Sequence, residues 1–237
     1  MSPQAAEAPV NQSVERAARM LGLFSVDEPE LSLSELTSRM RLTKATGHRY
    51  ATALRRAGLL RATNGVYSLG PRVVELAAAA LAGLGVIRVA EPYMLRLVSE
   101  TGQTTVLSVW DGEAPVVVRV AENHERLVRI VVAAGSRLPP DSAQGQVFRA
   151  FIGENDDPEL EAVRCDQLAA NAVVVEGVTA VAAPVFQSEQ IVATMALVGT
   201  SATIDAEPGS LMTAALRDAA TGLSTELGFV QNQKETR

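Results

Sequence analysis

The side chains best suited to bind another molecule are concentrated between residues 32 and 72. This stretch contains eight Lys or Arg residues and a single acid, Glu35, which is a local charge of +7. Contact with a phosphate backbone requires such a charge. A solvated basic face on a helical hairpin is the alternative, so the elements that position these residues decide between the two interpretations.

Two helices joined by a tight turn are predicted to position these residues. Ser32 and Glu35 form a capping box, in which the serine hydroxyl accepts from the Glu35 amide and the carboxylate reaches back to the Ser32 amide. Thr43 is the predicted N-cap of a second helix over residues 44–57. Gly58 is expected to end that helix, as glycine often does one residue beyond the last turn.

A β-hairpin is predicted directly after the second helix. Two short runs of alternating apolar residues, 59–63 and 66–69, flank Asn64 and Gly65. Both turn residues tolerate the positive φ of a type I′ turn. Helix, turn, helix and hairpin in this order predict a winged helix-turn-helix domain over residues 13–70, whose second helix fits a DNA major groove.

The helical period divides the second helix into an inner and an outer face. Tyr50, Ala51, Leu54 and Ala57 are expected to face the core. Gly47 stands where an apolar residue is expected, and it should cost roughly 1 kcal/mol of helix stability relative to alanine. The residues expected to contact double-stranded DNA are Lys44, Ala45, Thr46, His48, Arg49, Arg55, Arg56, Arg61 and Tyr67. Those at the start of the helix should approach bases, the later arginines should hold phosphates, and the tyrosine should add a contact from the wing.

The segments around this domain follow from composition and periodicity. Residues 1–12 are expected to be disordered. Ser13 is the predicted N-cap of a first helix, whose apolar stripe is Val14, Ala17, Ala18, Leu21 and Phe24. Residues 71–85 are predicted to form a linker helix that is apolar nearly all round. Such a helix must be buried on most sides, so we expect it to pack against its own copy, with burial between the two domains of one chain as the alternative.

Residues 86–237 are predicted to form an α+β domain. One helix is expected to end at Gly102, a short one to cover residues 142–151, and Pro208 to open the last. Strands are predicted over residues 104–110, 115–121, 127–133, 178–186 and 190–199. Strands arranged as hairpins, with helices gathered on one side, are typical of an α+β sheet domain.

The net charge separates the two parts of the chain. Residues 1–72 carry a net charge of +4, whereas residues 73–237 carry −10. A basic N-terminal part and an acidic C-terminal part indicate a nucleic-acid-binding module fused to a domain that does not bind nucleic acid. The acidic part should repel DNA and leave contact to the first domain.

Catalysis, metal binding and export are not expected. The chain has two histidines and one cysteine. His124 is interpreted as a residue of a charged loop and Cys165 as a small apolar side chain, because no nucleophile motif, phosphate loop or metal-ligand spacing accompanies them. We therefore expect no enzyme activity, no cofactor and no metal. We also expect no signal peptide, because the first residues have neither a basic end nor an apolar run, and no apolar run reaches the roughly 20 residues of a membrane span; this predicts a cytoplasmic protein.

Several motifs, taken together, resemble those of the IclR family of bacterial transcriptional regulators. They are SVERA at residues 13–17, LSLSEL at 31–36, KATGHR at 44–49, YSLGPR at 67–72, GSRLP at 135–139 and GVTAVAAPV at 177–185. The resemblance covers most of the chain. It implies a homodimer or homotetramer that dimerises through the linker helix, binds an operator, and holds a small organic effector in a GAF-like α/β domain.

The resemblance also implies where an effector would bind. In such regulators the site lies between the loop and helix after the GSRLP-like motif and the two late strands. The matching positions here are Ser142, Ala143, Gln144, Gly145, Gln146, Ala180, Ala196 and Val198. Members that bind small carboxylates have Cys, Thr or Ser at several of these positions. More methyl groups favour a bulkier, more apolar effector, such as an aromatic or branched carboxylic acid.

In this interpretation the effector carboxylate would meet Ser142 and the amides of residues 144–146. The alternative is that these alanines and valines are packed core with no ligand. Residues 152–177 form a shorter run than the family usually has here, which predicts a more open pocket or a lid from a neighbouring subunit.

Two other functions stay open. In one, the protein is a DNA-binding oligomer whose C-terminal domain only oligomerises. In the other, an enzyme or a ligand-binding module carries a vestigial helix-turn-helix, although no catalytic constellation favours the enzyme. Thermal stabilisation by a ligand would identify a sensor, because a ligand that binds the folded state stabilises it by RT ln(1 + [L]/Kd).

Overall fold

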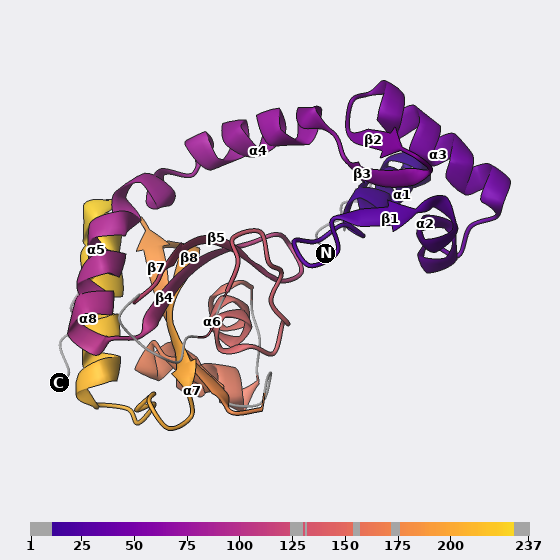
Figure 1. The fold of residues 1–237 in the computed structure, drawn as a ribbon. Helices are drawn as coiled ribbons and strands as arrows, with labels where there is room; N and C mark the ends of the chain where they lie inside the picture. The colour runs from indigo at the N-terminus through magenta and orange to yellow at the C-terminus, as the bar shows by residue number, and fades with distance from the viewer. Residues whose placement is uncertain (1–10, 124–129, 131, 154–156, 172–175, 230–237) are drawn as a thin grey trace, which may run out of the picture. The chain divides into compact units, whose positions relative to one another are not determined.

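The computed structural model describes residues 11–123, 130, 132–153, 157–171 and 176–229. Contacts divide the chain into two compact units, Met1–Ala80 and Leu81–Arg237 (Figure 1). Of the segment predicted to be disordered, only residues 11 and 12 are described, and both belong to the first helix or its cap. His124 lies outside the described residues.

The first unit packs three helices against a three-stranded antiparallel sheet. Its elements are α1 (Gln12–Leu21), β1 (Glu30–Ser32), α2 (Leu33–Arg39), α3 (Lys44–Arg56), β2 (Leu60–Thr63) and β3 (Val66–Leu69). The sheet order is β1-β3-β2, so a strand that the sequence patterns did not predict joins the hairpin. One apolar core with Met20, Leu36, Ala51 and Leu60 at its centre holds helices and sheet together. This is the predicted winged helix-turn-helix.

The short-range signals of this unit are confirmed. Ser32 Oγ accepts from the Glu35 amide at 3.2 Å, and the Glu35 carboxylate accepts from the Ser32 amide at 2.7 Å. Thr43 Oγ1 caps α3 by accepting from the amide of its third residue at 3.3 Å. Asn64 and Gly65 have φ values of 53° and 83°. Positive φ at both positions is what a type I′ turn requires.

Three predictions for this unit are wrong in detail. Asn11, not Ser13, is the N-cap of α1, and its side chain accepts from the Ser13 amide at 3.1 Å. Val14 is 65% exposed whereas Met20 is fully buried, so the buried stripe of α1 is rotated from the predicted one. Ala57 is exposed because it already belongs to the turn after α3.

The packing of α2 against α3 explains Gly47. A Cβ atom at this position would lie 2.1 Å from Cγ2 of Thr37. Thr37 is itself buried, and its hydroxyl donates to the carbonyl of Ser34 at 3.0 Å. Glycine permits this close approach of the two helices. The expectation of an apolar side chain at Gly47 is therefore wrong, because a tertiary contact outweighs helix propensity here.

The apolar helix α4 (Pro71–Gly83) follows the wing and contains the boundary between the units. None of its residues is buried, and Val74 and Leu76 are 70% and 51% exposed. The composition of α4 predicts a buried helix, but the described residues of a single chain do not bury it.

The second unit is an antiparallel sheet with helices on both faces (Figure 1). Its elements are α5 (Gly85–Thr101), β4 (Thr104–Trp110), β5 (Pro115–Ala121), α6 (Ala143–Phe151), α7 (Pro158–Asp166), β6 (Ala169–Asn171), β7 (Val178–Gln187), β8 (Gln190–Thr200) and α8 (Leu211–Glu226). The sheet order is β5-β4-β8-β7-β6. Helices α5 and α8 pack together on one face, and α6 covers the other with α7 beside it.

Side-chain alternation along the strands builds two apolar layers. Leu107 and Met195 belong to the larger core under α5 and α8. Ala182 and Ala196 face the other way and pack with Val147 of α6 in a smaller core. The predicted α+β class is confirmed, but the helices lie on both faces of the sheet and not on one.

Other predictions for this unit are corrected as well. Ser210 caps α8 by accepting from the Thr213 amide at 3.1 Å, so Pro208 lies in the preceding loop and does not open the helix. The strand predicted at 127–133 falls largely outside the described residues, and residues 132 and 133 are not in a strand. Helix α7 and strand β6, both within the short 152–177 segment, were not predicted.

Candidate nucleic-acid interface and effector-binding face

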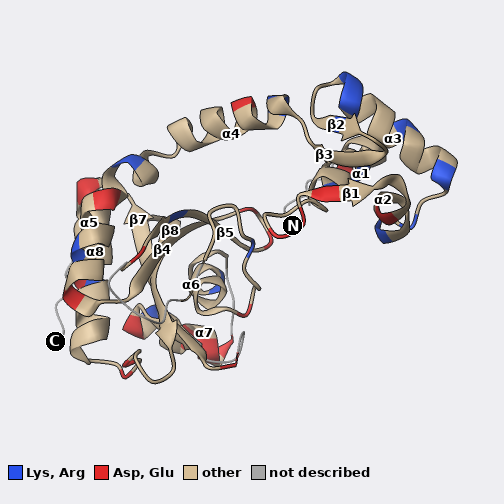
Figure 2. Ribbon diagram, viewed as in Figure 1, with Lys and Arg blue, Asp and Glu red and all other residues tan. Residues whose placement is uncertain are grey.

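The outward face of α3 carries basic side chains that have no partner among the described residues. Its exposed basic side chains are Lys44, His48, Arg49, Arg55 and Arg56. Within the described part of the chain, none of these side chains takes part in a hydrogen bond or an ion pair. Figure 2 shows basic residues recurring along α3, which has no acidic residue. Cations that are not neutralised internally are available to phosphates and bases.

A shallow hollow lies on this face between the longer side chains. It is lined by His48, Arg49, Thr52, Ala53, Arg56 and Ala57. Thr52 and Ala53 are small, so they leave space between the two arginines. A guanidinium pairs bidentately with a guanine edge or holds a phosphate, so this surface can contact both bases and backbone.

The neighbouring helix shows what a structural arginine looks like in this unit. The Arg39 guanidinium of α2 donates to both carboxylate oxygens of Glu28. This hydrogen-bonded pairing lowers the pKa of the Glu28 carboxyl below its usual value. Arg39 is thus engaged within the protein, in contrast to Arg49 and Arg56.

The wing presents Arg61 but not Tyr67. Arg61 Nε donates to Ser68 Oγ across the β2–β3 pair at 2.7 Å, which orients the guanidinium. Tyr67 is 8% exposed and belongs to the core, where its strand partner on β1 is Leu31. The predicted wing contact by the Tyr67 ring is therefore corrected, because alternate residues of a strand face opposite sides and this one faces inward.

In the second unit, the start of α6 is held by its own polar groups. Ser142 Oγ accepts from the Gly145 amide at 3.2 Å. Gly145 packs so closely that a Cβ would lie 2.2 Å from the carbonyl oxygen of Pro140. Gln146 Nε2 donates to the carbonyl of Asp141 at 3.1 Å. Ser142 and the Gly145 amide, both expected to meet an effector carboxylate, are thus bonded to each other.

Of the apolar positions predicted for the effector site, Ala180, Ala196 and Val198 lie on the sheet face that α6 covers, and Ala143 lies on α6 itself. The register pairs Ala180 with Val198 and Ala182 with Ala196. Ala143 and Ala196 are buried in the core under α6, whereas Ala180 and Val198 are half-buried. The structure therefore gathers these residues around one helix, and it packs half of them tightly.

The sequence patterns missed the polar side chains beneath α6. Ser108 Oγ donates to Gln144 Oε1 at 3.1 Å, and Gln144 Nε2 donates to the carbonyl of Val106 at 3.4 Å. Gln144 was predicted for its backbone amide and not for its side chain. Ser108 interrupts an apolar run in β4, and this interruption was the signal that could have identified it.

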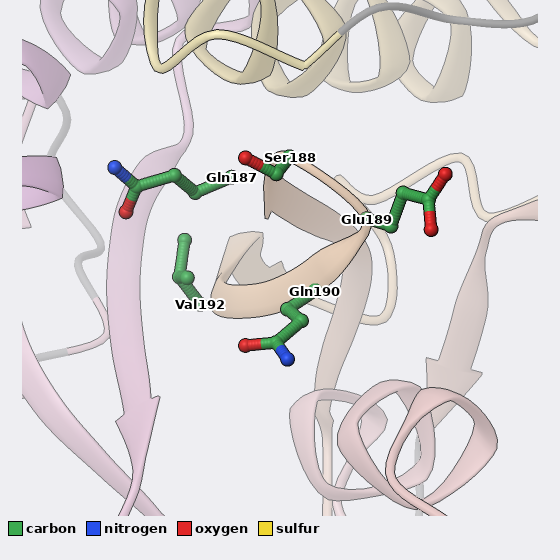
Figure 3. Close-up of a pocket in the computed structure, with 5 residues that line it drawn as sticks. All are labelled: Gln187, Ser188, Glu189, Gln190 and Val192. Atoms are coloured by element: carbon green, nitrogen blue, oxygen red, sulfur yellow. The ribbon is translucent and has the colours of Figure 1, made fainter.

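Other features of the described residues are less suited to binding. Figure 3 shows a shallow pocket at the β7–β8 turn, whose side chains point apart and do not converge; it is lined by Gln187, Ser188, Glu189, Gln190 and Val192. Within the described ranges, no group of three His, Cys, Asp or Glu residues could hold a metal ion. No single described helix is long and apolar enough to cross a membrane, and α4 and α5 pass that test only together, as a bent pair.

Two family models match the chain. Residues 13–63 match the IclR helix-turn-helix domain, and residues 78–174 match the bacterial transcriptional regulator IclR C-terminal domain. The first match covers α1 to β2, and the second reaches from α4 into the segment after β6. Together they include both the outward face of α3 and the start of α6.

Curated relatives and a solved structure agree with these models. The chain is 33% identical to the HTH-type transcriptional regulator XynR of Escherichia coli over 150 residues, which span 62% of this chain and 59% of that relative. It is 27% identical to the HTH-type transcriptional regulator KipR of Bacillus subtilis, over 92% of this chain and 98% of the relative. An IclR homolog from Microbacterium hydrocarbonoxydans, complexed with 4-hydroxybenzoate, has the same fold, with a TM-score of 0.72 at 24% identity over 91% of this chain and 99% of that one.

Proposed function

The chain belongs to the IclR family of bacterial transcriptional regulators, and from this premise we propose that it binds operator DNA through α3 and the wing and senses a small organic molecule under α6. The single observation that carries the DNA-binding proposal is the row of exposed, internally unpaired cations on α3. Arg49 would read a base edge, and Arg56 and Arg61 would hold phosphates.

The proposed assembly is a homodimer or homotetramer in which α4 packs against its copy. Exposed apolar side chains support this, because Val74, Leu76 and Leu81 remain 70%, 51% and 44% exposed in a single chain. A symmetric dimer would present two copies of α3, which suits a near-palindromic operator. The relatives XynR and KipR are HTH-type transcriptional regulators, which supports a regulatory function.

The proposed effector is an aromatic or branched carboxylic acid. The alanine-rich sheet face under α6 supports an apolar ligand body, and the start of α6 would favour a carboxylate through its helix dipole. The IclR homolog from Microbacterium hydrocarbonoxydans, which has this fold, binds an aromatic carboxylic acid, 4-hydroxybenzoate. Binding would shift the affinity for DNA by a coupling free energy on the order of 1–3 kcal/mol.

Tight packing of Ala143 and Ala196 favours one alternative function. In that alternative the C-terminal domain only oligomerises, and the protein binds DNA without a ligand. The two functions differ in a measurable way, because a sensor gains thermal stability from its ligand and a pure oligomer does not.

The experiment that tests the proposal has two parts. Purified full-length protein first selects duplexes from a random DNA library, and fluorescence anisotropy then measures affinity for a selected and an unrelated duplex at several salt concentrations. A thermal-shift screen against small organic acids, aromatic ones included, follows on the same preparation. No selected sequence would refute DNA recognition. Selected DNA with no thermal shift for any acid would favour the oligomer without a ligand.

A further inference from the structure

One hydroxyl under α6 is fully buried and has no partner. Thr194 of β8 is completely inaccessible, and its Oγ1 is one of three buried side-chain polar atoms of the described residues that make no hydrogen bond. The others are Thr105 Oγ1 and Arg217 Nε. Buried polar groups in folded proteins are nearly always satisfied. An unpaired hydroxyl at the proposed effector face therefore calls for a partner.

The register of the sheet places Thr194 beside a polar pair. Thr194 lies opposite Ser108 on the neighbouring strand β4. Directly opposed residues of antiparallel strands point to the same face of the sheet. Ser108 Oγ donates to Gln144 Oε1 at 3.1 Å, so this face is the one that α6 covers. Ser108, Gln144 and Thr194 thus form one buried group of polar side chains, called the polar triad below.

The hydrogen-bond donors and acceptors of the polar triad that are still unused define which ligand group could bind to it. The Thr194 hydroxyl can still donate and accept. The Gln144 amide has used its oxygen on Ser108 and one N–H on the Val106 carbonyl, which leaves one N–H donor. A ligand group that both accepts and donates, such as a hydroxyl, satisfies these atoms together. Because no Lys or Arg side chain of the described residues bonds to the polar triad, a buried carboxylate would lack a counter-charge there.

The surroundings of the polar triad define the body of the ligand. On one side lies the alanine pair Ala182 and Ala196, which presents only methyl groups. On the other side Trp110, two residues along β4 from Ser108, contacts Phe148 of α6 with ring centroids 5.4 Å apart. Methyl groups and aromatic rings on either side of a polar centre suit a flat aromatic molecule.

We propose that the polar triad is the specificity-determining end of the effector site and binds the uncharged hydroxyl of a hydroxylated aromatic compound. This inference rests on the proposed effector function and deepens it. A carboxylate on the same molecule would lie against the backbone amides at the start of α6 and not against the side chains of the polar triad. Since Thr194 is fully covered in this structure, entry of the ligand requires α6 to separate locally from the sheet, which couples binding to a change in conformation.

The test compares two isosteric variants with each other. Thr194→Val removes the hydroxyl of the polar triad. Thr105→Val removes the other threonine hydroxyl that makes no hydrogen bond. Residue 105 stands opposite Leu197 in the sheet register, so its side chain lies on the opposite face, under α5 and α8. Both variants should raise Tm without ligand by roughly 2–4 °C, because each removes an unsatisfied buried group. Thr194→Ser keeps the hydroxyl and serves as the conservative variant.

The probes are matched pairs of compounds, 4-hydroxybenzoate with benzoate and 4-hydroxyphenylacetate with phenylacetate. Thermal shift and titration should show that a hydroxylated member binds wild type, Thr105→Val and Thr194→Ser, and binds Thr194→Val at least about tenfold more weakly. The members without the hydroxyl should bind wild type and Thr194→Val alike.

Three results would overturn the inference. They are an unchanged response of Thr194→Val to the hydroxylated compounds, equal binding of both members of each pair by wild type, and no binding of any hydroxylated compound. Fluorescence anisotropy with selected DNA, measured on the same preparations, distinguishes failure of the polar-triad inference from failure of the proposed function. DNA binding that responds to a different class of acid would leave the proposed function intact and remove the polar triad from it.

Discussion

Helices α3 and α6 begin with the same type of side-chain N-cap, but they are suited to different functions. Thr43 caps α3 and Ser142 caps α6, each by accepting from the amide three residues on. Each helix also has a glycine in its first turns at which a Cβ would collide with a neighbour, at 2.1 Å for Gly47 and 2.2 Å for Gly145. Yet α3 turns its polar side chains outward, whereas six of the nine residues of α6 are buried.

The difference lies in what surrounds each helix. One side of α3 packs on a small core and the other meets solvent, so its long cations stay free for a large charged partner. Helix α6 lies over a sheet, where any polar group must find a partner in the interior. The exposed helix suits recognition of a macromolecule, and the buried one suits recognition of a small molecule by a few well-placed atoms.

The largest effect should come from the glycine of the buried helix. Gly145→Ala places a Cβ against the backbone carbonyl of Pro140, which cannot rotate away. Overpacking of this kind should reduce the free energy of unfolding by about 3 kcal/mol, measured by urea denaturation. Gly85→Ala, where nothing lies within 4 Å of the added atom, is the matched control. A loss below about 1 kcal/mol would show that α6 is loosely held, and it would weaken the contrast with α3.

On the exposed helix, the main effect should be on DNA and not on stability. Arg49→Ala should weaken binding of a selected duplex by about 1–3 kcal/mol and relax sequence preference, because a base contact is lost. Arg61→Ala should weaken selected and unrelated duplexes alike, and it should lower the slope of log K against log salt by about one. Anisotropy with both duplexes measures the difference. Unchanged sequence preference in Arg49→Ala would remove this residue from base reading.

A smaller effect is expected from the glycine of α3. Gly47→Ala gains roughly 1 kcal/mol of helix propensity but meets the methyl of Thr37, so we expect a net loss of about 1 kcal/mol in the free energy of unfolding. Thr37→Ser removes that methyl while keeping the hydroxyl that bonds Ser34. The double variant should therefore be more stable than Gly47→Ala alone. If the losses in the free energy of unfolding of Gly47→Ala and Thr37→Ser simply add in the double variant, the contact between α2 and α3 is not the reason for glycine at residue 47.

The smallest effect concerns the charge of the capping box. Hydrogen bonds with Ser32 lower the pKa of the Glu35 carboxyl from its usual 4.5. The folded state thus favours the ionised form, so this stabilisation is present above pH 4.5 and is lost as the pH falls through the lowered pKa. Glu35→Gln should make thermal stability less dependent on pH in that acid range. Glu30→Gln, outside the capping box, is the control, and equal pH profiles for both variants would contradict the assignment.

The N-terminal unit shows how far sequence patterns reach. The capping box, the Thr43 cap, the Asn64-Gly65 turn and the cations of α3 depend on residues a few positions apart, and all were predicted as the structure has them. The inward position of Tyr67 was not predicted, because β1 pairs with β3 from some 35 residues earlier in the chain.

Sequence patterns were enough to predict the winged helix-turn-helix, the α+β class and the family, since these follow from local periodicity, caps and motifs, but they did not predict β1, α7 or β6. Tertiary contacts were needed to explain why Gly47 and Gly145 are glycines, why helices cover both faces of the sheet, and why Thr194 lies beside Ser108 and Gln144. Those facts depend on contacts between residues distant in the chain. Periodicity specifies which side of an element is apolar, but packing alone specifies what that side meets.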